Sequence, residues 1–126
     1  MREMIARYLA IGLAGSAGAL LRYVIGAQVG RFNIRFPLGT FIINITGSFF
    51  LGWFLTYVTK HNISDTTRLA IGVGFVGAYT TFSTFMYDSV NLIDQGAILL
   101  ALANLGGSLF IGLASVWLGM LLAKST

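Results

Sequence analysis

Hydrophobic residues occur in four long blocks along the chain, and short polar segments separate these blocks. A helix needs about 20 mainly apolar residues to cross the hydrocarbon core of a bilayer. The pattern therefore predicts an all-α integral membrane protein with four transmembrane helices in a single domain, residues 1–126. The expected spans are 4–27, 38–59, 69–93 and 97–123.

The polar segments carry signals for helix ends. Pro37, the only proline, suits the first turn of the second helix. Ser64 and Asp65 are N-cap candidates for the third helix. The sequence DQG predicts a tight turn between the third and fourth. Linkers this short make consecutive helices antiparallel neighbours, so both termini are expected on one side of the membrane.

The N-terminal sequence MREMIARYLAIGLAGSAGALLRY has features of a signal peptide, namely a basic start, an apolar run and small residues near its end. The apolar run continues past Arg22, however, and the rest of the chain is also membranous. We therefore favour a retained first helix over cleavage.

Composition supports a membrane protein and excludes several kinds of site. The chain is 56% hydrophobic and only 10% charged, whereas a soluble domain carries about 25% charged residues. It has no cysteine, and its single histidine, His61, has no companion for a metal site. No span contains a histidine, a cysteine or a carboxylate pair, so we expect no enzyme activity. The net charge of +4 comes from residues around the spans, which favours contact with lipid head groups over nucleic acid.

Basic residues are distributed unevenly between the two ends of the spans. The end that is expected to hold both termini carries five basic residues: Arg2, Arg7, Lys60, Arg68 and Lys124. The other end carries two, Arg31 and Arg35, and Arg22 lies inside the first span near that end. The positive-inside rule converts such a difference into an orientation. Because the bias is modest, termini inside is preferred but either orientation stays open.

The chain contains 16 glycines, and several lie on small helix faces. Gly12, Gly15 and Gly18 recur every three residues, and Ser108 and Gly112 form a small-xxx-small pair, as do Gly15 and Ala19. Small faces let helices approach closely, which drives association in lipid. Four helices bury little as a monomer, so an oligomer, most simply a dimer, is expected.

Polar residues within the spans are few. Arg22 either reaches the interface or attracts anions at a water-filled vestibule. Asp88 is expected to reach the interface or cap a break. Asn44, Asn104 and Ser108 either join helices or line a path, and the last two share a helix face. No span has a central carboxylate, which argues against proton-coupled transport.

The third span contains GAYTTFSTF, residues 77–85, with four hydroxyl side chains in five positions. Glycine weakens a helix and threonine hydroxyls compete for its backbone groups, so we expect a break around residues 77–81, near the bilayer midplane. Non-helical backbone survives there only if protein or water covers it. Such breaks expose carbonyls to a cation and amides to an anion. Phe82 and Phe85 share a face and either pack in the core or present ring edges to an anion.

Three motifs, GSAGALLRY, GTFIINITGSFFLG and TTFSTF, occur in this order. Together with the four spans they resemble the small fluoride channel family known as Fluc or CrcB, over essentially the whole chain. The resemblance implies a passive, fluoride-selective channel in the inner (plasma) membrane, which exports fluoride and lowers its toxicity. It also implies an antiparallel, dual-topology homodimer with two fluoride pathways along the interface.

The resemblance also implies roles for individual residues. Backbone carbonyls of Gly77 and Thr80 would hold a central structural sodium ion. The fluoride pathway would include residues from the second, third and fourth spans: Asn44, Phe82, Phe85, Ser83, Thr84, Ser108 and Asn104. Two positions depart from the family pattern, because Ala78 replaces a frequent glycine and Asn104 replaces a frequent tyrosine. The second departure leaves the role of Asn104 open.

Two other functions compete with this interpretation. A small multidrug-type exporter would need a glutamate embedded in the first helix, but the only glutamate, Glu3, lies at the extreme N-terminus. A non-transporting membrane assembly subunit would explain the small faces but not the hydroxyl-rich break. The chain has no GxxxxGK[ST] loop for ATP.

Overall fold

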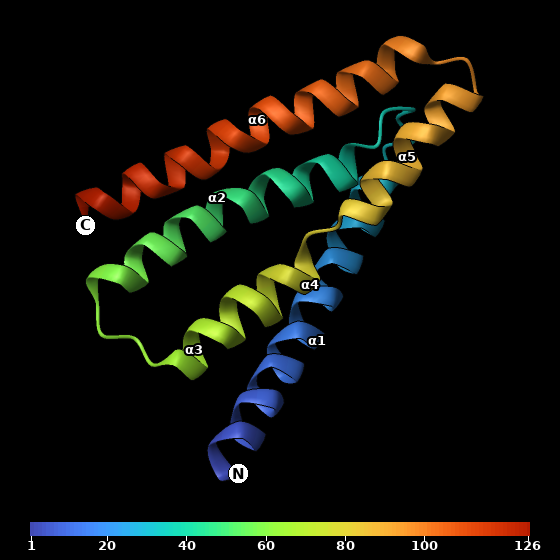
Figure 1. Ribbon diagram of the computed structural model, residues 1–126. Helices are drawn as coiled ribbons and strands as arrows, with labels where there is room; N and C mark the ends of the chain where they lie inside the picture. Colours follow the sequence, from blue (N-terminus) through green and yellow to red (C-terminus); the bar gives the residue numbers. More distant parts are fainter.

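The computed structural model describes residues 1–126 as an all-helical chain of four rods (Figure 1). The rods are α1 (Arg2–Gly30), α2 (Leu38–Lys60), a composite third rod and α6 (Ile98–Ser125). The third rod contains α3 (Asp65–Leu69), the π-helix η1 (Ala70–Val76), α4 (Gly77–Tyr79) and α5 (Phe82–Asp94). Each rod is long and apolar enough to cross a membrane, so the predicted four-span, all-α membrane fold is confirmed.

The helix ends follow the local sequence signals closely. Ser64 is the N-cap of α3, and its hydroxyl oxygen accepts the amide hydrogen of Thr67 at 3.2 Å. Gly96 has φ of +71°, which glycine adopts without strain, and it makes the turn between α5 and α6. Pro37 stands at the N-cap of α2, one residue before the helix, and not in its first turn as expected.

Both termini lie at the same end of the molecule as the linker between α2 and α3 (Figure 1). The ammonium group of Lys60, at the end of α2, donates to the carbonyls of Ala123 and Lys124 at 3.1 and 2.6 Å. These carbonyls are in the last turn of α6, where no further amide is available to them. This bond ties the ends of α2 and α6 together and agrees with four antiparallel spans.

Glycines bring the helix backbones into direct contact. A Cβ built on Gly18 of α1 would lie 2.1 Å from the carbonyl oxygen of Phe75 in η1, and one on Gly74 would lie 2.6 Å from that of Ile11. On the other side of the molecule, a Cβ on Gly119 of α6 would lie 2.2 Å from the carbonyl oxygen of Phe49. No larger residue permits these approaches without a shift of the backbone.

The small pairs singled out in the sequence make looser contacts. A Cβ on Gly15 would lie 3.5 Å from its nearest neighbour and one on Gly112 3.8 Å, both ordinary van der Waals distances. Gly12 faces open space. Spacing along one helix identifies a small face, but which glycine meets a neighbouring backbone depends on the crossing point of two helices.

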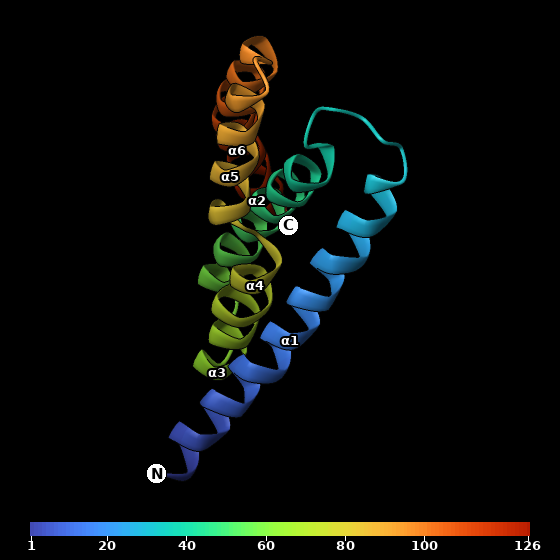
Figure 2. The same ribbon diagram turned by 90° about the vertical axis from the view of Figure 1, so that its right-hand side faces the viewer.

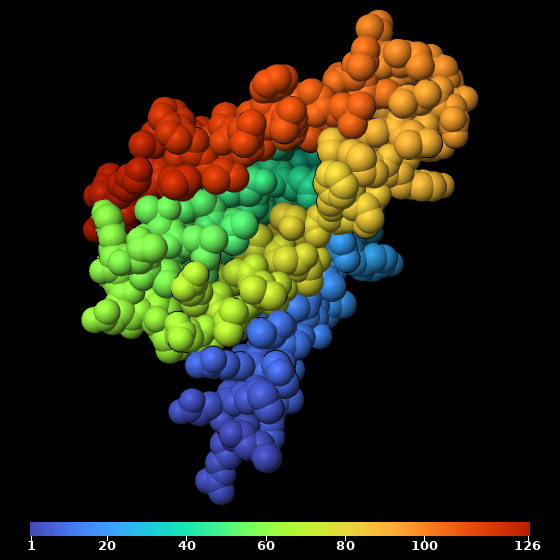
Figure 3. All heavy atoms as spheres, in the orientation of Figure 1, coloured from blue at the N-terminus to red at the C-terminus, as the bar shows by residue number.

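The single chain is open and buries few of its residues. Only 16 of 126 residues are buried, and α1 diverges from α5 toward the end opposite the termini (Figure 2). The space-filling view shows α5 projecting beyond α4 to reach α6 (Figure 3). Large apolar side chains cover the outside, as a lipid environment requires. The expected dimer remains a prediction.

Candidate functional site

The third rod is interrupted at Thr80 and Thr81, near the middle of its span of residues 65–94. Thr80 has ψ of 159° and Thr81 has φ of −151° and ψ of 114°, both extended. The predicted break is therefore confirmed, but it begins three residues later than Gly77, which is helical with φ of −60°. Gly72 and Gly74, earlier in the rod, lie in the π-helix η1, a widened helix often found at functional sites.

Asn44 of α2 pairs with the extended backbone at the break. Its Nδ2 donates to the carbonyl of Thr81 at 3.0 Å, and its Oδ1 accepts the amide of Thr81 at 2.8 Å. One side chain thus satisfies both backbone groups of a residue that has left the helix. This matters because an unpaired polar group in the bilayer core costs several kcal/mol.

Thr81 then starts the second half of the rod as the N-cap of α5. Its Oγ1 accepts the amide of Thr84 at 3.2 Å and donates to the hydroxyl of Thr84 at 3.0 Å. In a continuous helix the amides of residues 81 and 84 would donate to the carbonyls of Gly77 and Thr80. Both amides donate to side chains instead, so these two carbonyls lose their helical donors.

A hollow of about 240 Å³ lies beside the break and includes Asn44, Thr80 and Phe82 in its lining. The ring of Phe82 is 73% exposed and meets that of Phe85 edge to face, with centroids 6.1 Å apart. Ser48, one turn after Asn44 on α2, also lines the hollow and has no hydrogen-bond partner in the chain. The sequence analysis did not identify Ser48, although its i+4 spacing from Asn44 places both on one helix face.

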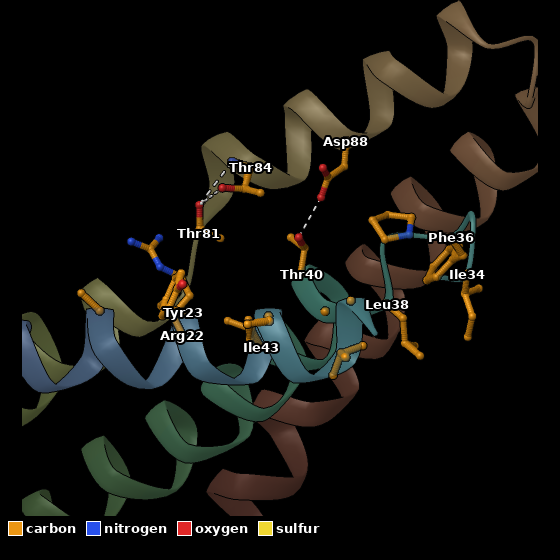
Figure 4. Close-up of a pocket in the computed structure, with 17 residues that line it drawn as sticks. Arg22, Tyr23, Ile34, Phe36, Leu38, Thr40, Ile43, Thr81, Thr84 and Asp88 are labelled. Atoms are coloured by element: carbon orange, nitrogen blue, oxygen red, sulfur yellow. Dashed lines mark hydrogen bonds between the residues drawn. The ribbon is translucent and has the colours of Figure 1, made fainter. Parts of the chain in front are cut away.

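A larger cavity of about 620 Å³ lies between α1, α2 and α5 and reaches the same break. Arg22 points into it on the side of Thr81, while Asp88 and Thr40 face each other across it (Figure 4). The hydroxyl of Thr40 donates to Oδ2 of Asp88 at 2.7 Å. Arg22 makes no ion pair, because Arg7 and Asp65 form the only one in the chain. Arg22 is thus a cation without an ion-pair partner in a partly polar cavity, and its role in a vestibule stays a prediction.

Some hydroxyl groups near the break donate their hydrogen to another group of the chain, and others do not. Thr80 donates to the carbonyl of Val76 at 3.0 Å, Thr40 to Asp88 and Thr81 to Thr84. Their hydrogens are used within the chain. Donors that remain available to an ion are the hydroxyl of Thr84 and the second N–H of Asn44, together with Ser48 and Arg22. The hydroxyl of Ser83 donates only a long bond of 3.4 Å to Oγ1 of Thr81, whose own hydrogen is used on Thr84.

Asn104 and Ser108 do not join this group. Asn104 is fully buried between α5 and α6, where its Nδ2 donates to the hydroxyl of Ser89 at 3.0 Å. Ser108 lies one turn further along α6, and its hydroxyl is 3.5 Å from Oδ1 of Asn104. Within one chain, Asn104 joins two helices, and neither residue lines the two spaces at the break.

Four membrane spans, a rod broken near the middle of its span and a partly polar hollow beside the break are features of a small membrane channel. Comparison with known proteins agrees with this class. The CrcB-like protein family (Camphor Resistance, CrcB) matches residues 9–120, and the chain belongs to this family.

Several named relatives are similar over nearly their whole length. A protein of Acidobacterium capsulatum named fluoride-specific ion channel FluC is 46% identical, over 94% of this chain and 96% of its own. The protein of the same name from Solibacter usitatus is 41% identical, over 94% and 98%. Fluoride-specific ion channel FluC 2 of Geobacillus kaustophilus is 44% identical, over 93% and 92%.

Proposed function

We propose that this chain forms a passive, fluoride-selective channel of the inner membrane that lets fluoride leave the cell and so lowers its toxicity. The names of the relatives support fluoride as the ion. The observation that carries the proposal is the break at Thr80 and Thr81. Asn44 stabilises it through two hydrogen bonds to the backbone of Thr81, and the exposed ring of Phe82 lies beside it. An unbroken apolar helix would offer an anion no donors at this depth.

The free donors match what a fluoride ion needs. Fluoride is small and strongly hydrated, so a pathway must replace its water with well-placed donors. Hydroxyls of Ser83 and Thr84, the amide of Asn44 and the positive ring edges of Phe82 and Phe85 can supply them. None of these groups carries a full charge, so an ion that binds can also leave. Arg22, in the neighbouring cavity, raises the local concentration of anions without holding them at the narrow part.

The structural sodium and the antiparallel homodimer belong to the same proposal. The carbonyls of Gly77 and Thr80 lack their helical donors, and Gly77 is exposed on the surface of the single chain. Hard cations prefer such oxygen ligands, and the chain has no cluster of three acidic or histidine side chains to serve instead. Two carbonyls from each of two symmetric subunits would supply four ligands. A sodium ion there would stiffen the break and add positive potential.

The decisive test is anion efflux from liposomes that contain the purified protein, with a potassium ionophore to balance charge. We expect rapid release of fluoride and almost no release of chloride. Equal chloride release would reject selectivity, and no anion release would favour an assembly subunit. Release of an organic cation driven by a proton gradient would favour the multidrug-type exporter.

Replacement of sodium on both sides by a large organic cation tests the metal site. We expect fluoride flux to fall after prolonged exchange and to recover when sodium returns, because the break would lose a ligand that holds it. Full flux after exchange, with loss of bound sodium verified by elemental analysis, would reject the sodium site and leave the fluoride pathway standing.

A further inference from the structure

A separate groove lies at the end of the molecule that holds both termini. It has a volume of about 550 Å³ and lies between α1, α2, α3 and η1. Arg7, Arg68 and Asp65 are the charged residues of its lining. The rest of its wall is apolar apart from one glycine: Leu51, Leu55, Leu69, Gly72 and Val73.

The two arginines in this groove have donors to spare. Nε of Arg7 is buried and has no hydrogen-bond partner. Nη2 of Arg7 lies 3.9 Å from Oδ2 of Asp65, an ion pair too long for a hydrogen bond, and Asp65 is 73% exposed. Arg68 makes no ion pair. Each guanidinium has five N–H donors, so one exposed carboxylate leaves most of them free and leaves the groove with a net positive charge.

The position of the groove along the membrane normal is also distinctive. Arg7 is in the second turn of α1, and Arg68 is in α3 at the start of the third span. Both therefore lie where helices leave the hydrocarbon and meet the head groups, the depth that arginine favours. Leu51, Leu55 and Val73 lie deeper on α2 and η1, and Val73 is 59% exposed. The groove is thus cationic at head-group level and apolar below it.

We propose that this groove binds one anionic phospholipid. Arg7 and Arg68 hold the phosphate, each able to donate two parallel hydrogen bonds to its oxygens, and an acyl chain lies along Leu51, Leu55 and Val73. Basic pockets between transmembrane helices bind anionic head groups in this way. Asp65 swings toward water, which its exposure permits. The site does not depend on which ion the chain conducts.

The test is native mass spectrometry of the full-length protein in detergent, incubated with equal amounts of phosphatidylglycerol and phosphatidylcholine. Two arginines at head-group level predict retention of phosphatidylglycerol roughly tenfold above phosphatidylcholine. The double variant Arg7→Ala/Arg68→Ala is expected to lose this preference. Arg2→Ala/Arg31→Ala removes the same charge from exposed positions outside the groove and is expected to keep it.

Two further measurements test whether the groove recognises a lipid phosphate, and one of them uses a variant that keeps the charge and the fold. Arg7→Lys/Arg68→Lys keeps the charge and the fold but loses the planar fork, so an intermediate preference is expected. Excess inorganic phosphate is expected to displace little lipid, because it lacks the acyl chain. Complete displacement would assign the site to free phosphate. Equal retention of both lipids by the unmodified protein would overturn the proposal, as it would if a partner subunit covered the groove. An unchanged preference in Arg7→Ala/Arg68→Ala would overturn it as well.

Discussion

At the residue scale, the site depends on how each polar group near Thr81 is paired. Asn44 pairs both backbone groups of Thr81, and Thr81 pairs the amide and hydroxyl of Thr84. The sequence indicated these residues because hydroxyls and an amide are rare in apolar spans. It could not indicate their pairing, because Asn44 and Thr81 are 37 positions apart and meet only through the packing of two helices.

Replacement of Asn44 by alanine tests whether this pairing holds the break. The variant leaves the amide and carbonyl of Thr81 without partners, at a cost of about 1–3 kcal/mol for each group. We expect a lower thermal midpoint in detergent and a large loss of fluoride flux. Asn91→Ala removes an exposed amide from α5 and is the control, expected to change neither measurement. Unchanged stability and flux in Asn44→Ala would show that the extended backbone at the break does not need the hydrogen bonds of Asn44.

Isoleucine at Phe82 or Phe85 tests the role of the aromatic edges. The side chain keeps most of its apolar bulk but loses the positive ring edge, a contribution of about 0.5–1.5 kcal/mol. Fluoride flux is expected to fall roughly threefold to tenfold for each variant, with the oligomeric state unchanged in size-exclusion chromatography. Phe32→Ile, in the linker after α1, is the matched control, since Phe32 is 70% exposed outside the spans. Unchanged flux in both variants would mean that the two rings only pack against their neighbours and do not contact the ion.

At the element scale, the broken third rod and the close helix contacts carry the fold. The spans could be predicted because the bilayer requires long apolar runs. The break was located within three residues, because glycines and hydroxyls mark weak helix, but a regular helix was expected where η1 is a π-helix. The spacing of three residues named both Gly18, which meets a neighbouring backbone, and Gly12, which meets none, so it could not tell a contact glycine from a free one.

Gly18 and Gly12 offer a matched test of that contact on one helix. In Gly18→Ala the new methyl group would lie 2.1 Å from the carbonyl oxygen of Phe75, so α1 must move away from η1. Overpacking of this kind costs about 1–3 kcal/mol, and we expect a clear drop in thermal stability. Gly12→Ala meets nothing within 4 Å and is expected to be neutral or slightly stabilising. Equal behaviour of the two variants would contradict the close approach of α1 and η1.

At the scale of the whole molecule, the open shape and the weak charge bias lead to the same expectation. One chain leaves Phe82, Gly77 and much of α6 uncovered, and a second copy would cover them. An antiparallel pair additionally needs chains in both orientations. Five basic residues at one end against three toward the other give too small a difference to fix one orientation.

The absence of cysteine makes the orientation directly measurable. Asn62→Cys places one thiol in the linker between α2 and α3, and Gln95→Cys places one at the opposite end of the molecule; both positions are exposed. If chains insert in both orientations, a membrane-impermeant maleimide is expected to label about half of each variant in intact cells and all of it after permeabilisation. Near-complete labelling of one variant with none of the other would mean a single orientation. Such chains could pair only in parallel, and an antiparallel dimer, with its two opposed pathways, would then be impossible.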